Sequence, residues 1–218
     1  MKRYFITGTN TDCGKTYVTA QLMEYYPQAI AIKPVASGCD ERGGQLVSHD
    51  AQYLKQFCSL SLNEITPWRF KLPISPHLAA RAEGVTLKIA ELADYCLKFS
   101  AKNKNTLFIE GAGGLMVPLN ETETWIDFLS LTKIPVILVV GMTLGCINHA
   151  LLTQVALAHY KIPCAGWIAN CLDNQMLALH ENITTLTEVL SFPLLSVIPY
   201  KGAISTFKSL NVGLFDHV

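Results

Sequence analysis

A glycine-rich loop near the N-terminus constrains the fold of this chain more than any other feature. It runs GTNTDCGKT over residues 8–16, directly after the apolar run Tyr4–Thr7 and before a helical pattern that starts at Lys15. A strand, a glycine loop and a helix in this order form an anion site, because backbone N–H groups and the helix N-terminus meet phosphate oxygens. In such a loop Lys15 reaches the β- and γ-phosphates and the hydroxyl of Thr16 binds Mg²⁺. The strict pattern has four residues between its glycines, whereas this loop has five.

Short apolar runs alternate with helical patterns along the rest of the chain. This alternation predicts β-α-β crossovers and one α/β domain over residues 1–218, a P-loop NTPase-like fold with a mostly parallel sheet and helices on both faces. Thr86 is the predicted N-cap of the fourth helix, and the proline-rich stretch Trp68–Pro76 is a predicted surface loop. The predicted strands are Tyr4–Thr7, Ala29–Ile32, Thr106–Ile109, Val136–Val140, Ala165–Ala169 and Leu194–Ile198. The predicted helices are Lys15–Tyr25, His49–Phe57, His77–Glu83, Leu87–Ser100, Thr124–Leu131, Ile147–Tyr160 and Asn174–Leu190.

Composition excludes several other classes of protein. Charged residues make up only 16% of the 218 residues, against a typical ~25%, so intrinsic disorder is not expected. The formal net charge is zero and there is no Lys/Arg block, so no nucleic-acid partner is expected. Low charge also favours association into a homo-oligomer. The chain has seven cysteines, an odd number, and no two of them form a C-x-x-C pair. Both facts argue against a disulfide framework and against a structural zinc site.

A membrane-spanning segment is the alternative for the stretch between Lys133 and Lys161. Its 27 residues carry no formal charge, and ~20 apolar residues suffice to span a bilayer. However, Pro135, Gly141 and Gly145 interrupt it, so a buried strand followed by a helix is the better interpretation. No long apolar run follows the first positive charges, so no signal peptide and a cytoplasmic location are predicted.

Polar residues follow the predicted strands, where parallel α/β sheets bind their ligands. Lys33 follows the second strand in KPVASG; it is either a solvated rim charge or a second cation for an anionic intermediate. Asp50 belongs either to a helix start or to a Mg²⁺ site. Glu110 ends the third apolar run before GAGG, the place of a Walker-B-type acid.

The later strands are followed by further candidates. Gly145 opens a helix after the fourth strand, and its N-terminus is a possible anion site. His149 is predicted to be a packed or capping residue rather than a catalyst. Asn170 closes the fifth strand and can hydrogen-bond a base, and Pro199-Tyr200 follows the sixth. Because few polar side chains are evident there, weak selectivity for ATP over GTP or CTP is expected.

Taken together, the motifs TGTxTxxGKT, KPVASG, HD, EGAGG, PVILVVG and LGCINHA resemble those of the dethiobiotin synthetase family. The resemblance extends from about Tyr4 to Tyr200, and the five-residue spacing of the phosphate loop is typical of that family. Residues 201–218 match less clearly.

The resemblance implies ring closure on 7,8-diaminononanoate with CO₂, ATP and Mg²⁺, in a homodimer that binds its substrate at the interface. Lys15 and Lys33 would be catalytic, and Thr16, Asp50 and Glu110 would hold Mg²⁺. The implied substrate residues are Thr11, Lys33 and Ser37, together with Gly145, Cys146, Ile147 and Asn148 of the neighbouring subunit. The implied nucleotide-binding residues are Asp12, Cys13, Gly14, Lys15, Thr16, Tyr17, Asp50, Glu110, Gly111, Ala112, Gly113, Asn170, Cys171, Ile198, Pro199 and Tyr200.

Two other classes share parts of this pattern. Partner-gated ATPase switches of the partition or metal-delivery type have the same order of sheet and loop, but usually carry a second lysine early in the loop. Thr9 and Asn10 stand there in this chain. A cobyrinate-type amidotransferase needs a glutaminase domain, for which 218 residues leave no room.

Overall fold

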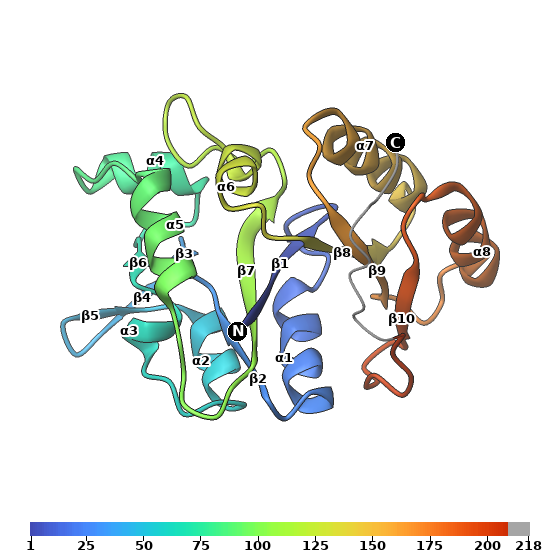
Figure 1. Ribbon diagram of the computed structural model, residues 1–218, viewed down its shortest axis with the longest axis horizontal. Coiled ribbons are helices and arrows are strands. Elements are labelled where there is room, and N and C mark those ends of the chain that lie inside the picture. The colour runs from blue at the N-terminus through green and yellow to red at the C-terminus, as the bar shows by residue number, and fades with distance from the viewer. Residues whose placement is uncertain (209–218) are drawn as a thin grey trace.

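A six-stranded sheet forms the centre of the molecule in the computed structural model, which describes residues 1–208 (Figure 1). Its strand order is β10-β9-β8-β1-β7-β2, and all neighbouring pairs are parallel. The predicted fold class is therefore confirmed. The strands are β1 (Lys2–Gly8), β2 (Ala29–Ile32), β7 (Thr106–Gly114), β8 (Val136–Met142), β9 (Cys164–Cys171) and β10 (Leu194–Ile198).

Helices cover both faces of the sheet, with α1 on one face and α6 and α7 on the other (Figure 1). Because α1 leads away from β1 to one face and α7 leads away from β8 to the other, a crevice forms where β1 and β8 lie side by side. The helices are α1 (Lys15–Tyr25), α2 (His49–Lys55), α3 (Leu62–Ile65), α4 (Pro76–Ala82), α5 (Ile89–Lys98), α6 (Trp125–Thr132), α7 (Cys146–His159) and α8 (Leu179–Val189).

The core explains why the end of β7 is held in place. Phe5 of β1 packs against Trp125 and Phe128 of α6, with ring centroids 5.1 and 5.6 Å apart. The buried indole of Trp125 also donates a hydrogen bond of 3.0 Å from Nε1 to the carbonyl of Ala112. Thr124 caps α6 in a capping box with Asp127, which fixes where that helix begins. Aromatic packing and this hydrogen bond thus position the glycine segment that ends β7.

Several predicted boundaries are wrong. The predicted loop Trp68–Pro76 contains β6 (Trp68–Arg69), which pairs with β3 (Val35–Ala36). These two-residue strands are too short to leave a periodic pattern. Lys88, not Thr86, is the N-cap residue of α5. Residues 174–178 lie outside α8, since Ala178 at its N-cap has φ 53°. The sequence also gave no sign of α3 or of the hairpin of β4 (Asp40–Arg42) and β5 (Gln45–Val47).

The long uncharged stretch forms β8 and α7, as the strand-and-helix interpretation predicted. No helix within residues 1–208 is long and apolar enough to cross a membrane. All seven cysteines are free thiols. The predicted domain runs to residue 218, and its last ten residues lie outside the described part of the chain.

Candidate functional site

The phosphate loop joins β1 to α1 with the geometry that the motif predicted. Gly14 has φ 83° and stands at the N-cap of α1. A Cβ at Gly14 would lie 2.1 Å from Nδ2 of Asn170, so only glycine fits here. Gly141 of β8 has a similar role, because a Cβ there would lie 2.9 Å from Cα of Cys13. The loop thus lies directly against the carboxyl ends of β8 and β9, with no room for a side chain at either glycine.

Lys15 lies buried inside this loop. Its ammonium donates hydrogen bonds to the carbonyls of Asn10 at 2.9 Å and Thr11 at 3.1 Å. Burial lowers the pKa of Lys15, while Cys13 and Glu110 partly offset this effect. The ammonium is therefore held at the loop, close to where an N-terminal anion site would place phosphate oxygens.

Four predicted residues from separate elements meet beside the loop. The ammonium of Lys33 contacts Glu110 Oε1 at 2.9 Å and also contacts the carboxylate of Asp50. Thr16 Oγ1 donates to the same Glu110 oxygen at 2.6 Å. Lys33 is 7% exposed, so the interpretation of Lys33 as a solvated rim charge is wrong. Asp50 lies in the first turn of α2, as its helix-start interpretation predicted, and it also contacts Lys33. Its role as a Mg²⁺ ligand stays a prediction.

Electrostatics keep this cluster charged. Burial lowers the pKa of Lys33, but Glu110 and Asp50 raise it more, so the net pKa is raised. Burial likewise raises the pKa of Asp50, but the charge of the Lys33 ammonium and the hydrogen bond that it donates bring the pKa below its ordinary value. The ammonium and the Asp50 carboxylate thus stabilise each other's charged form across the neutral range.

The oxygen atoms of this cluster fit a magnesium ion. Glu110 is fully buried, and its Oε2 atom has no hydrogen-bond partner within residues 1–208. A buried carboxylate oxygen without a partner is costly unless a cation reaches it. Mg²⁺ takes one or two carboxylates and keeps several waters, which matches Glu110, the half-exposed Asp50 and the hydroxyl of Thr16.

The glycine segment Gly111–Gly113 adjoins the phosphate loop. Gly113 has φ 69°, and a Cβ there would lie 3.8 Å from Oγ1 of Thr11. Thr11 and Asp12 are exposed, and Tyr17 is half-buried on α1. Ser37 is half-buried after β3, and its side chain forms no hydrogen bond within the described residues. The structure therefore does not bring Ser37 into the hydrogen-bonded cluster.

The predicted base-binding residues lie at the ends of β9 and β10. Asn170 is buried, and its amide donates a 2.9 Å hydrogen bond to the carbonyl of Cys13 in the phosphate loop. Ile198 is buried in β10. A cavity of about 470 Å³ lies beside them, and its lining includes Cys171, Pro199 and Tyr200. Sequence reasoning missed its remaining walls, Asp173, Asn174, Leu179, His180, Ile183 and Val197.

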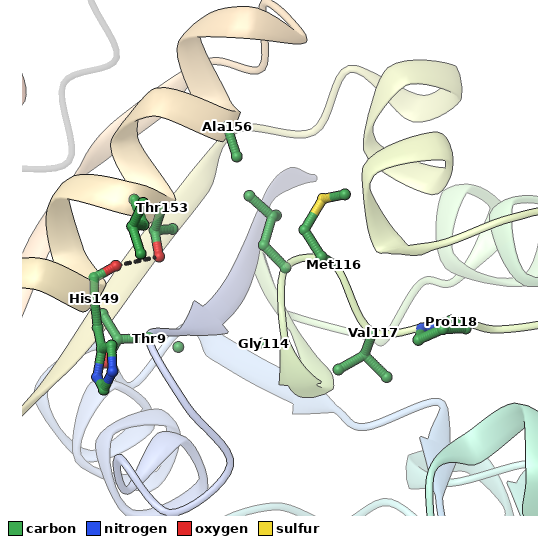
Figure 2. A pocket seen from close by; sticks show the side chains of 11 residues that line it. Thr9, Gly114, Met116, Val117, Pro118, His149, Thr153 and Ala156 are labelled. Atoms are coloured by element: carbon green, nitrogen blue, oxygen red, sulfur yellow. Dashed lines mark hydrogen bonds between the residues drawn. The ribbon is translucent and has the colours of Figure 1, made fainter.

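A second cavity, of about 430 Å³, opens beside the phosphate loop between α7 and the segment after β7 (Figure 2). His149 and Thr153 of α7 lie on one side, and Met116 and Val117 lie on the other (Figure 2). Thr9 of the phosphate loop also lines the cavity. His149 is exposed, and no side chain of the described residues caps the N-terminus of α7. The prediction that His149 is a packed or capping residue is therefore wrong. The apolar residues 115–118, directly after the glycine run, were the signal that sequence reasoning overlooked.

Gly145 stands directly before α7, as predicted from its position after the strand β8. Gly145 has φ 92° at the N-cap. Cys146 is buried, Ile147 is half-buried and Asn148 is exposed. Leu144, directly before them, is 100% exposed.

The parallel sheet, the glycine loop with its lysine and the buried Glu110 on a neighbouring strand define a P-loop nucleotide-binding protein. Solved structures agree on the fold: a ParA family ATPase from Chlorobium tepidum has a TM-score of 0.55 at 13% identity, covering 91% of this chain and 85% of that chain. The MinD cell division protein from Aquifex aeolicus has a TM-score of 0.54 at 12% identity, covering 91% and 82%. Residues 2–206 match the AAA_26 family, described as an AAA domain.

Relatives found by sequence identify the family, whereas the solved structures above show only the fold. The ATP-dependent dethiobiotin synthetase BioD of Legionella pneumophila strain Paris is 60% identical over 205 residues, which cover 94% of this chain and 97% of the relative. That of Pseudoalteromonas translucida is 41% identical over 206 residues, covering 92% and 91%. The chain belongs to the family of ATP-dependent dethiobiotin synthetases. The partition-type ATPases therefore share its fold, while the family membership favours the ligase over the gated switch.

Proposed function

We propose that this chain is an ATP- and Mg²⁺-dependent ligase that closes a ureido ring on 7,8-diaminononanoate with CO₂, giving dethiobiotin, ADP and phosphate. The observation that carries the proposal is the buried cluster of Lys33, Glu110, Asp50 and Thr16 beside the phosphate loop. This chemistry requires chiefly positioning of the reactants and stabilisation of charge, which lysines at fixed sites supply.

The reaction proceeds through two anionic species. One amine of the substrate adds to CO₂ and loses a proton, giving a carbamate, and a carbamate oxygen then attacks the γ-phosphorus of ATP and releases ADP. The neighbouring amine attacks the carbonyl carbon of the resulting anhydride, loses a proton and expels phosphate. Lys15 binds the transferring phosphoryl group, while Lys33, with Thr11 and Ser37, holds the carbamate.

Thr16, Asp50 and Glu110 would hold Mg²⁺ with the triphosphate. The ion supplies charge neutralisation for the phosphoryl oxygens during transfer. With Glu110 and Asp50 holding the ion, the ammonium of Lys33 would be free to bind the carbamate. The unpartnered oxygen of Glu110 supports this assignment.

The cavity of Figure 2 is our candidate for the hydrocarbon chain of the substrate, since most of its lining is apolar and it adjoins Gly8 and Thr9. Large apolar side chains are exposed near it, among them Met116, Leu144, Leu152 and Val155 at 51%, 100%, 60% and 64%. Such a patch favours an interface, and we infer a homodimer. Residues Gly145–Asn148 of one subunit would then bind the substrate carboxylate in the other.

We place the base of the nucleotide beside Asn170, near Cys171, Ile198, Pro199 and Tyr200. The hydroxyl of Tyr17 supports this placement, because it donates a 2.6 Å hydrogen bond to the carbonyl of Gly202 and ties that segment to α1. Asp12, Cys13 and Gly14 would contact the phosphates through the loop backbone, with Gly111–Gly113 packed close by.

Phosphate release tests the function. Purified protein is assayed with ATP, Mg²⁺, bicarbonate and 7,8-diaminononanoate, and each component is omitted in turn. We expect release to require all four. Release that is independent of the diamine would contradict the ligase and favour the gated ATPase switch. The cytoplasmic location stays a prediction.

A further inference from the structure

The chain continues after β10 as an irregular segment, residues 202–208, which we call the strap. Its half-buried residues are Gly202, Ile204 and Phe207, and the residues between them are exposed. The side chains of Ile204 and Phe207 pack against the hydrophobic core. One side of the strap therefore faces the body of the protein and the other faces solvent.

Two side chains of α1 hydrogen-bond to the backbone of the strap. The hydroxyl of Tyr17 donates a 2.6 Å bond to the carbonyl of Gly202. Oε1 of Gln21 accepts a 3.1 Å bond from the backbone N–H of Ile204. Residues four positions apart lie on one face of a helix. The strap therefore follows a single face of α1, with one contact in each of two successive turns.

The later part of the strap is fixed to both α1 and β10. The ring of Phe207 packs on that of Tyr25, with the centroids 5.8 Å apart. The hydroxyl of Ser196 in β10 donates a 2.7 Å hydrogen bond to the carbonyl of Thr206. Because β10 is an edge strand of the central sheet, the strap lies between this edge and α1.

The turn that leads into the strap contains two walls of the cavity at the ends of β9 and β10. Pro199 and Tyr200 line this cavity of about 470 Å³. Lys201 has φ 53°, and the backbone N–H of Gly202 donates a 2.9 Å bond to the carbonyl of Pro199. The ammonium of Lys201 lies over the ring of Tyr200, 5.1 Å from its centroid. The place at which Gly202 is anchored therefore decides where both cavity walls stand.

Both sides of this cavity are connected to the phosphate loop. On one side, the buried amide of Asn170 donates to the carbonyl of Cys13 in the loop. On the other side, the anchor of the turn is Tyr17, two residues after Lys15 in the first turn of α1. Two independent hydrogen bonds thus fix the spacing between the phosphate loop and the cavity. A fixed spacing of this kind lowers the cost of binding a ligand that fills both places.

We propose that Tyr17 and Gln21 are positioning residues for the base of the nucleotide, and that they act through the strap. Their hydrogen bonds hold Pro199 and Tyr200 at the distance from the phosphate loop that a bound nucleotide requires. This inference rests on the proposed function, which places the base in this cavity. Without the hydroxyl of Tyr17, the half-buried carbonyl of Gly202 would turn towards water. The apparent affinity then falls with the fraction of molecules in which the turn stands in place.

The test compares two ligands that both occupy the phosphate loop, of which only one has a base. The binding of ADP and of tripolyphosphate, each with Mg²⁺, is measured by calorimetry for wild type, Tyr17→Phe, Gln21→Leu and the double variant. We expect the Kd of ADP to rise about fivefold in Tyr17→Phe and at least about tenfold in the double variant, as for the loss of one and of two neutral hydrogen bonds. The Kd of tripolyphosphate should change by less than about twofold.

Tyr95→Phe is the matched control. It removes a tyrosine hydroxyl that also donates to a backbone carbonyl, that of Glu64, and so connects α5 to α3. Its loss of stability should be similar to that of Tyr17→Phe, whereas its affinity for ADP should equal that of the wild type. An effect of general destabilisation is thereby separated from an effect on the cavity.

Three results would overturn the inference. The first is a Kd of ADP in the double variant within about twofold of wild type. The second is an equal loss of affinity for tripolyphosphate, which would mean that the variants disturb the phosphate loop itself. The third is wild-type protein that binds ADP no more tightly than tripolyphosphate. Phosphate release that is independent of the diamine would contradict the ligase alone, and the comparison of the two ligands still decides the role of Tyr17 and Gln21.

Discussion

Replacing Lys33 with methionine removes the ammonium from the buried cluster while keeping a side chain of similar length. Breaking a buried ion pair by removing one partner costs ~3–5 kcal/mol, because the other charge is left uncompensated. Glu110 has an exposed side-chain fraction of 0% and bears that cost in full, whereas the side chain of Asp50 is 44% exposed and is partly compensated by water. We therefore expect the lower end, about 3 kcal/mol less stability in metal-free protein.

The assay is urea unfolding of Lys33→Met and wild type, each in EDTA and in Mg²⁺. A loss of about 3 kcal/mol corresponds to a fall in Tm of about 6–12 °C for a chain of this length. Because Mg²⁺ would neutralise the same carboxylates, it should recover much of the loss, about 2.7 kcal/mol at a hundredfold its Kd. The wild type, with its resident ammonium, should gain less from Mg²⁺ than the variant does.

Two controls sharpen this test. Lys98→Met removes an exposed i,i+4 partner of Asp94 and should cost at most about 0.5 kcal/mol. The double variant Lys33→Met/Glu110→Gln should be more stable in EDTA than Lys33→Met alone, because the uncompensated charge is also removed. If Lys33→Met unfolds within about 1 kcal/mol of wild type in EDTA, the ammonium does not compensate the two carboxylates and the electrostatic reasoning is refuted.

Three further predictions concern the same site. Lys15→Ala should fold normally but lose turnover by several orders of magnitude, because the lysine stabilises charge during phosphoryl transfer; steady-state activity within about threefold of wild type would remove Lys15 from the mechanism. Asp50→Asn and Glu110→Gln should each require more Mg²⁺ for half-maximal activity rather than lose nucleotide binding, since Mg²⁺ takes few protein ligands; titration curves that overlay the wild type would make both carboxylates purely structural. The lowered pKa of Asp50 means that its contribution to stability is present above its ordinary value of 3.8 and is lost as the pH falls through the lower folded value. The deficit of Asp50→Asn in urea unfolding should therefore shrink when the pH is lowered below that value, and a deficit constant from pH 7 to pH 2 would contradict this sign.

Local pattern alone determined much of this fold. The bounds of β2, β10 and α1 agree with the predicted ranges Ala29–Ile32, Leu194–Ile198 and Lys15–Tyr25. Strands buried on both faces are continuous apolar runs, and the phosphate loop marks both the end of β1 and the start of α1. The sequence therefore contained the strands of the central sheet, their alternation with helices and the residues that stand at the carboxyl end of each of these strands.

Only the tertiary structure decided which of those residues meet. Lys33 and Glu110 are 77 positions apart, yet the parallel register that pairs Ile32 of β2 with Ile109 of β7 brings the two following residues side by side. Asp50 and Thr16 join them because the first turns of α2 and α1 start at the same edge of the sheet. Likewise, Asp173 faces a cavity that forms only where α8 packs beside the ends of β9 and β10. Strand register and helix packing are non-local, so no pattern within one segment could encode these contacts.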